Sequence, residues 1–256
     1  MENSPQPQQR VMTGRTALVT GAAGGIGGAI ALAFAREGAT LALMDRDAEG
    51  LTTIAAACSA APDVSIHCVD VTADDQVRDA VNAAKTRHGA PDVLVNCAGI
   101  NAEVSLVDME IAQWDHMMAV DLRSVFLFSR LVVPDMVEAG WGRVINIASQ
   151  LGQKGAVGMT HYSAAKAGVI GFTRALAREV APHNVLVNAI APGPIDTAIF
   201  VNVSAEWQAL KEAELPLGRF GRPDEVAPTA LLLASDPGGN LYVGQTLGPN
   251  SGDVMQ

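Results

Sequence analysis

The chain has 256 residues, of which 49% are hydrophobic, and it carries a formal net charge of −10. This length and hydrophobic content predict one α/β domain with a large buried core rather than two domains. The acidic charge, without a cluster of basic residues, argues against nucleic-acid binding, because an acidic surface repels phosphate backbones. A solvated surface with no functional meaning would give the same net charge.

Residues 1–13 are predicted to form a disordered tail, because the opening segment is polar, rich in Pro and Gln, and has no apolar core typical of a secretion signal. The sequence contains no run of about 18 apolar residues, so no membrane span is predicted. Cys58, Cys68 and Cys97 are too few and too scattered for a disulfide framework, and the histidines show no metal-ligand spacing. These features favour a cytoplasmic protein without a metal site.

Short apolar runs rich in β-branched residues alternate with segments of helical periodicity. The runs fall at residues 16–20, 40–44, 64–69, 92–96, 143–148, 184–190 and 241–247. Such alternation predicts a doubly wound, seven-stranded parallel sheet with helices on both faces, in a single Rossmann domain of residues 14–256. Because ligands bind at the carboxyl ends of such strands, the residues after each strand are the candidate site.

A glycine-rich turn after the first strand leads into a helix. Gly21, Gly25 and Gly27 would let the backbone approach a pyrophosphate, while the helix N-terminus offers free N–H groups to the phosphates. Asp45 ends the second strand, 20 residues after Gly25, near the separation expected for a carboxylate that holds a ribose 2′-hydroxyl. Because a carboxylate repels a 2′-phosphate, the sequence predicts NAD in preference to NADP.

Tyr162 and Lys166 are four residues apart in a helical segment and therefore share one helix face. The ammonium would favour the phenolate and move the Tyr162 pKa from about 10 toward neutrality, where Tyr can exchange a proton with an alcohol or carbonyl. Ser149, at the end of the fifth strand, would donate a hydrogen bond to the same substrate oxygen. A Tyr and Lys at this spacing also fit an ordinary surface helix, but the glycine turn upstream favours catalysis.

Together these residues resemble the short-chain dehydrogenase/reductase family, over about residues 14–252. The residues that match its TGxxxGxG cofactor motif and its catalytic Ser, Tyr and Lys are Thr20, Gly21, Gly25, Gly27, Ser149, Tyr162 and Lys166. The resemblance implies that Tyr162 and Lys166 also contact the cofactor. The other cofactor-binding residues that it implies are Ile26, Arg46, Asp70, Val71, Asn96, Ala98, Gly99, Pro192, Gly193, Ile195 and Thr197.

The chain departs from the family pattern at four places. Asp121 stands where the family has a fourth catalytic residue, an Asn that braces a helix kink whose carbonyl holds a water next to the Lys. Asp can accept a backbone hydrogen bond but cannot donate one through an amide, so we expect the proton relay to survive with altered pH dependence. Cys97 replaces an Asn, Ser251 lies in a segment that is often Asp-Gly-Gly, and Pro228 is expected to interrupt a helix.

The resemblance implies reversible hydride transfer between a secondary alcohol and a ketone, with Tyr162 as base in oxidation and acid in reduction. A small substrate is expected, with the candidate substrate residues Gln150, Met159, His161 and Phe200. Gln150 and His161 could favour a polar substrate, while Met159 and Phe200 could line an apolar part of the pocket. Polar side chains that are simply solvated at the mouth of a cleft would give the same pattern. The resemblance also implies a substrate lid at about residues 196–217. It further implies a homotetramer built through helices near residues 110–138 and 160–181 and through the last strand.

Two alternatives remain. An NADPH-dependent 3-oxoacyl thioester reductase is favoured by the overall resemblance and opposed by Asp45. For an acyl-carrier substrate, the family tends to keep basic docking residues where this chain has Gly140 and His183. The second alternative is a dinucleotide-binding regulatory protein without turnover, which Asp121 alone supports.

Overall fold

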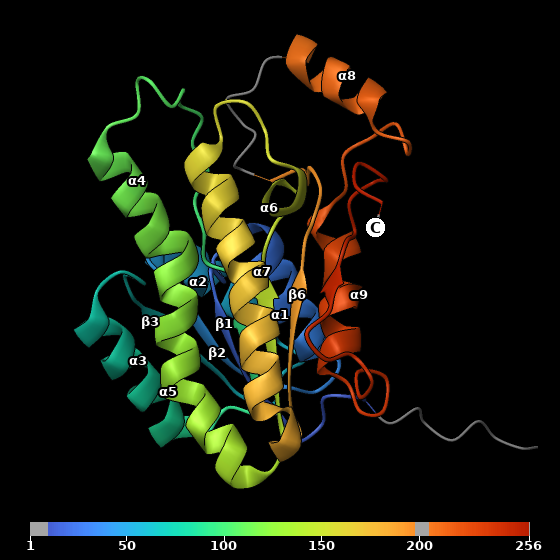
Figure 1. Ribbon diagram of the computed structural model, residues 1–256. Helices are drawn as coiled ribbons and strands as arrows, with labels where there is room; N and C mark the ends of the chain where they lie inside the picture. The colour runs from blue at the N-terminus through green and yellow to red at the C-terminus, as the bar shows by residue number, and fades with distance from the viewer. Residues whose placement is uncertain (1–9, 198–204, 256) are drawn as a thin grey trace, which may run out of the picture.

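The computed structural model describes residues 10–197 and 205–255 and contains a seven-stranded, all-parallel sheet (Figure 1). The strand order is β3-β2-β1-β4-β5-β6-β7. The strands are β1 (Thr16–Thr20), β2 (Thr40–Asp45), β3 (Val64–Cys68), β4 (Val93–Asn96), β5 (Gly142–Ile147), β6 (Val185–Ile190) and β7 (Thr246–Leu247). The predicted doubly wound Rossmann fold is therefore confirmed.

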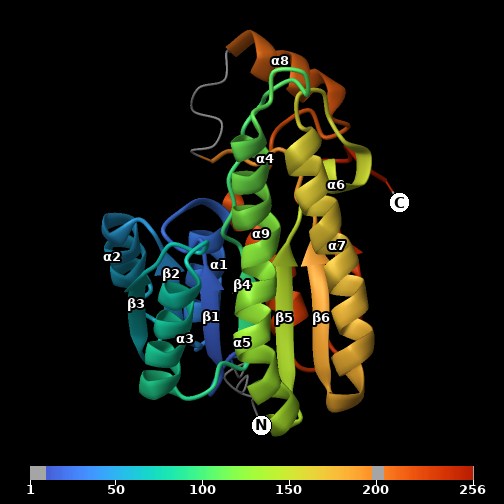
Figure 2. The same cartoon turned by 60° about the vertical axis from the view of Figure 1, so that its left-hand side comes forward.

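Helices cover both faces of the sheet, which explains why the central strands are apolar along their whole length. One face packs against α1 (Gly25–Arg36), α2 (Ala48–Ala57) and α9 (Pro223–Ala234). The other face packs against α3 (Asp74–His88), α5 (Ser124–Ala139) and α7 (Thr160–Val180), which Figure 2 shows side by side. All residues of β1, β4, β5 and β6 are buried as a result.

Five further helical segments complete the described part of the chain. They are α4 (Ile111–Met118), the π-helical turn η1 (Ala119–Arg123), α6 (Leu151–Lys154), the 3₁₀ turn η2 (Ala181–His183) and α8 (Ala205–Glu214). The helix predicted near residues 110–138 is thus α4 and α5 joined through η1. Helix α8 falls within the predicted lid, and both views place it beyond the carboxyl ends of β5 and β6 (Figures 1 and 2).

Two local expectations differ from the structure. Helix α9 runs through Pro228 without interruption, because Val226, Ala230 and Leu233 are buried in the core beside α1 and hold the helix in place. The lost backbone hydrogen bond is cheaper here than the loss of that packing. The run at residues 241–247 forms a strand only in its last two residues, because the backbone still turns at Gly244, where φ is +65°.

The predicted tail overlaps residues 1–9, which lie outside the described part of the chain. Across residues 10–197 and 205–255, no helix is long and apolar enough to cross a membrane. Cys58, Cys68 and Cys97 are all free thiols.

Candidate active site

The glycine turn after β1 is packed so tightly that two of its glycines have no room for a side chain. At Gly21, where φ is +66°, an added Cβ would lie 2.8 Å from the Ala98 Cα. At Gly27, an added Cβ would lie 2.1 Å from the carbonyl oxygen of Gly21. These contacts close the turn on itself and on the segment that follows β4, so that the ends of the two strands lie together.

Helix α1 begins at Gly25 with an uncapped N-terminus that faces open space. No side chain caps Gly24, and the first turn of the helix contains no acidic residue. A Cβ on Gly24 would meet no atom within 4 Å, while one on Gly25 would meet the Thr197 methyl at 3.5 Å. Free N–H groups at the positive end of a helix suit a phosphate, so this turn fits the pyrophosphate of a dinucleotide, with Ile26 partly buried beside it.

The Asp45 carboxylate is fixed against the glycine turn. Its Oδ2 accepts a hydrogen bond from the Ala23 N–H at 3.1 Å, and its Oδ1 accepts one from the Asp47 N–H at 3.1 Å. Arg46 is exposed next to it. A negative charge is thus held at the end of β2, beside the turn that fits the pyrophosphate.

Asp70 lies at the carboxyl end of the neighbouring strand, β3. Its Oδ1 accepts hydrogen bonds from the N–H and hydroxyl of Thr72, at 2.9 and 2.7 Å, and these bonds hold the pKa of Asp70 below its ordinary value. Asp70 is exposed and Val71 is buried. The carboxylate therefore faces solvent at the carboxyl ends of the strands, where Asp45 also lies.

The segment after β4 is held by a threonine whose role the sequence analysis missed. The Thr20 hydroxyl accepts hydrogen bonds from the N–H groups of Cys97 and Ala98, at 3.0 and 3.1 Å. The Asn96 side chain instead points into the core and donates to Asn146 Oδ1 at 2.8 Å. Any contact of Asn96 with a cofactor would therefore use its backbone.

Ser149, Tyr162 and Lys166 come together at the carboxyl end of β5. Lys166 is buried, donates to the Ile147 carbonyl at 3.1 Å, and lies 5.6 Å from the centre of the Tyr162 ring. Burial raises the pKa of Tyr162 above its ordinary value, although the Lys166 charge and the contact with Ser149 each lower it. The sequence predicted a net shift toward neutrality, and that direction is wrong here because burial has the larger effect.

Asp121 forms a contact that the sequence analysis did not predict. Its side chain is fully buried in η1, where Oδ1 accepts a hydrogen bond from the Ile100 N–H at 2.9 Å and Oδ2 lies 3.0 Å from Lys166 Nζ. An added Cβ on Gly99 would approach that Oδ2 to 2.9 Å, so Gly99 leaves room for the ion pair. Burial by itself would lower the pKa of Lys166, but the Asp121 carboxylate brings the net shift upward.

The segment after β6 closes the site on the side of the C-terminus. The Pro192 carbonyl accepts a hydrogen bond from the Gln150 N–H at 3.1 Å. An added Cβ on Gly193 would lie 2.7 Å from Asn250 Cα, which explains the glycine. Ile195 is buried and pairs with Gly221 in an isolated bridge.

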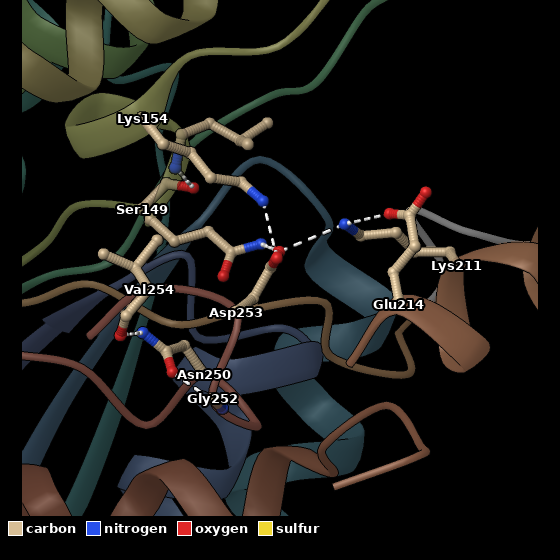
Figure 3. A network of polar contacts seen from close by, with 10 residues as sticks. Ser149, Lys154, Lys211, Glu214, Asn250, Gly252, Asp253 and Val254 are labelled. Carbon is tan, nitrogen blue, oxygen red and sulfur yellow. Dashed lines mark hydrogen bonds and ion pairs between the residues drawn. The ribbon is translucent and has the colours of Figure 1, made fainter. Parts of the chain in front are cut away.

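A polar cluster that the sequence did not signal lies beside Ser149 (Figure 3). Asp253 accepts hydrogen bonds from Gln150 Nε2 and Lys154 Nζ, each at 2.6 Å, and pairs with Lys211 Nζ of α8 at 3.2 Å. Burial alone would raise the pKa of Asp253, but the two lysines bring it below its ordinary value. The cluster joins three segments that are distant in sequence: the C-terminal segment, α6 and α8.

The other candidate substrate residues give a mixed picture. Met159 and His161 are buried, and neither ring nitrogen of His161 has a hydrogen-bond partner in the structure. Phe200 lies outside the described residues. Sequence reasoning had a signal for Gln150, which follows Ser149 directly, but no periodicity or motif marks Asp253 or Lys211.

The chain is similar to known proteins over nearly its whole length. The family model for short chain dehydrogenases matches residues 15–208. A 3-oxoacyl-[acyl-carrier-protein] reductase FabG of Thermotoga maritima is 40% identical over 245 residues, which cover 95% of this chain and 99% of the relative. The chain belongs to the short-chain dehydrogenase/reductase family. It is therefore an NAD(P)-dependent oxidoreductase that acts on CH–OH groups.

Two further similarities extend over nearly the whole chain. An acetoacetyl-CoA reductase of Allochromatium vinosum is 38% identical over 244 residues, covering 94% of this chain and 99% of the relative. The crystal structure of a short-chain type dehydrogenase/reductase from Mycobacterium marinum superposes with a TM-score of 0.90 at 32% identity. The superposition covers 97% of this chain and 98% of the Mycobacterium marinum chain.

Proposed function

We propose that the protein reduces 3-oxoacyl thioesters to 3-hydroxyacyl thioesters with NADH. The observation that carries the reaction type is the cluster of Ser149, Tyr162 and Lys166 beside the open glycine turn. Ser149 orients the substrate carbonyl and Tyr162 protonates its oxygen. Lys166 holds its charge next to the phenol, and the nicotinamide supplies the hydride when bound.

The substrate class rests on the relatives. Proteins named for 3-oxoacyl-[acyl-carrier-protein] and acetoacetyl-CoA reduction match the chain at 36–40% identity. This similarity favours the thioester alternative over the small secondary alcohol expected from the sequence. The test is the rate of NADH consumption with acetoacetyl-CoA, against a panel of polyols, sugars and hydroxy acids with NAD. Turnover of a polyol or sugar alone would contradict the thioester proposal.

The cofactor preference rests on Asp45. Its carboxylate lies at the end of β2, where it would accept hydrogen bonds from a ribose and repel a 2′-phosphate. The proposal therefore joins the thioester substrate to NADH, although the sequence analysis had paired it with NADPH. Rates with NADH and NADPH, measured at the same substrate concentration, decide this point.

A hydroxylated small-molecule substrate is a second candidate. It is favoured by the polar cluster of Gln150, Lys154 and Asp253 beside Ser149, which could bind hydroxyl groups. Oxidation of a polyol with NAD, together with no consumption of NADH when acetoacetyl-CoA is the substrate, would support it. Cofactor binding without any turnover would instead support a regulatory protein, and the intact Ser149, Tyr162 and Lys166 argue against that outcome.

The homotetramer and the cytoplasmic location also remain proposals. Phe126 of α5 is 50% exposed, and Leu122 and Phe172 are partly exposed on η1 and α7. An apolar surface on these helices is suited to contact between subunits. The mass in solution, measured by light scattering, tests the tetramer, and a monomer would contradict it.

A further inference from the structure

Asp121 contributes a charge that the asparagine of the family pattern would not. An asparagine oxygen could also accept the hydrogen bond from the Ile100 N–H, because the two side chains have the same shape. The second oxygen of Asp121, 3.0 Å from Lys166 Nζ, adds a full negative charge at a fully buried position. The difference between the two residues is therefore electrostatic, and it acts on Lys166 directly.

Four groups act on the ionisation of the Tyr162 phenol. Lys166 faces the phenol from the same helix, Asp121 from η1, Cys97 from the segment after β4, and Ser149 from the segment after β5. Burial raises the pKa of the Cys97 thiol to about 12, so this group is neutral at physiological pH. One cation and one anion remain, and their effects on the phenol oppose each other.

We propose that Asp121 is a positioning residue that offsets the charge of Lys166 and keeps Tyr162 in its phenol form well above neutral pH. The inference rests on the proposed function, because only the phenol can give a proton to a ketone oxygen. The Asp121 charge would thus extend to higher pH the range in which the site can carry out reduction. Oxidation, which needs the phenolate, is correspondingly favoured only in alkaline solution.

A direct titration of Tyr162 tests the proposal without substrate or cofactor. The chain has only two tyrosines, so the tyrosinate absorbance of the protein minus that of a Tyr162→Phe variant isolates Tyr162. We expect a midpoint above the ordinary value of 10.0. The same measurement on an Asp121→Asn variant subtracts the absorbance of the double variant that carries both Asp121→Asn and Tyr162→Phe. There we expect the midpoint of Tyr162 to fall by about one pH unit or more.

Asp79→Asn is the matched control, because it removes an exposed carboxylate from α3. It should move the midpoint by less than about 0.3 pH unit, since an exposed charge is screened by water and salt. A Tyr162 midpoint near neutrality in the unmodified protein would overturn the proposal, even if Asp121→Asn fails to fold. So would an Asp121→Asn midpoint equal to that of the unmodified protein.

Kinetics provides the second readout. The rate of NADH-dependent reduction should fall at high pH, and in Asp121→Asn this fall should begin about one pH unit lower. A purely structural role would lower the rate without moving the profile. If the titration behaves as expected but acetoacetyl-CoA is not reduced, the substrate proposal fails and the role of Asp121 stands.

Discussion

Replacement of Asp45 by Asn should weaken the preference for NADH over NADPH. The carboxylate is held by the N–H groups of Ala23 and Asp47, both at 3.1 Å, so it cannot easily move away from a nearby phosphate. At a separation of about 5 Å and an effective dielectric of about 20–40, a 2′-phosphate of about −1.5 charge would be repelled by about 2.5–5 kcal/mol.

Salt and water reduce that repulsion, and about 1.5–3 kcal/mol of discrimination would remain. This free energy corresponds to a ratio of kcat/KM values, NADH over NADPH, of about 10 to 150 in the unmodified protein. Asp45→Asn removes the charge and keeps one acceptor oxygen, so the ratio should fall by most of that factor. Steady-state kinetics with both cofactors at one concentration of acetoacetyl-CoA measures it.

Asp47→Asn is the matched control for this prediction. Asp47 is two residues away and caps α2 by accepting hydrogen bonds from the N–H groups of Glu49 and Gly50. Asn caps helices about as well as Asp, so the control removes a neighbouring charge and preserves the fold. Equal ratios in both variants and the unmodified protein, or a preference of the unmodified protein for NADPH, would refute the role assigned to Asp45.

Three further predictions concern stability, the glycine turn and α8. Ser251→Gly should raise the free energy of unfolding by about 1 kcal/mol and Tm by about 2–4 °C, because Ser251 has a φ of +56°; a lower Tm would contradict this. Gly27→Ala should abolish binding of NADH, because the added Cβ would lie 2.1 Å from the carbonyl oxygen of Gly21. The control Gly171→Ala, whose added Cβ would meet no atom within 4 Å, should bind NADH normally. The fluorescence of NADH measures binding in both variants. Asp253→Asn should speed proteolysis within residues 205–214 about fivefold, because α8 loses its ion pair to the C-terminal segment. Since the pKa of Asp253 is lowered from 3.8, this contact is complete above that pH and is lost on further acidification, so the unmodified protein and the variant should converge in acid.

The sequence predicted the sheet well because its strands are short, apolar and buried on both faces. Strand, glycine turn, helix and acidic residue occur in an order that few other folds would produce, and each lies where it was expected. The prediction was less accurate where packing decides the outcome. Pro228 was expected to break α9, but the buried face of the helix outweighs one lost hydrogen bond. The last strand was overestimated because apolar composition alone does not show where Gly244 turns the backbone.

The candidate site was predictable in its residues but not in its electrostatics. Spacing brings Tyr162 and Lys166 to one helix face, yet it says nothing about how strongly burial acts on the phenol. The polar cluster of Asp253, Gln150, Lys154 and Lys211 joins residues up to 103 positions apart, and no local pattern marks such a contact. Asn96 shows the converse, since its motif suggested the cofactor and its side chain faces the core.

Asp121 is the residue at which sequence pattern and physical chemistry lead to different conclusions. As a substitution for Asn it changes almost no volume, and its hydrogen bond to Ile100 needs only an oxygen. Removing a carboxylate from water is costly, however, and the cost is offset only where a partner charge lies close. Lys166 provides that charge at 3.0 Å, and Gly99 leaves the space for it. This buried charge, which the Asn of the family pattern would lack, is the basis of the role proposed for Asp121 at Tyr162.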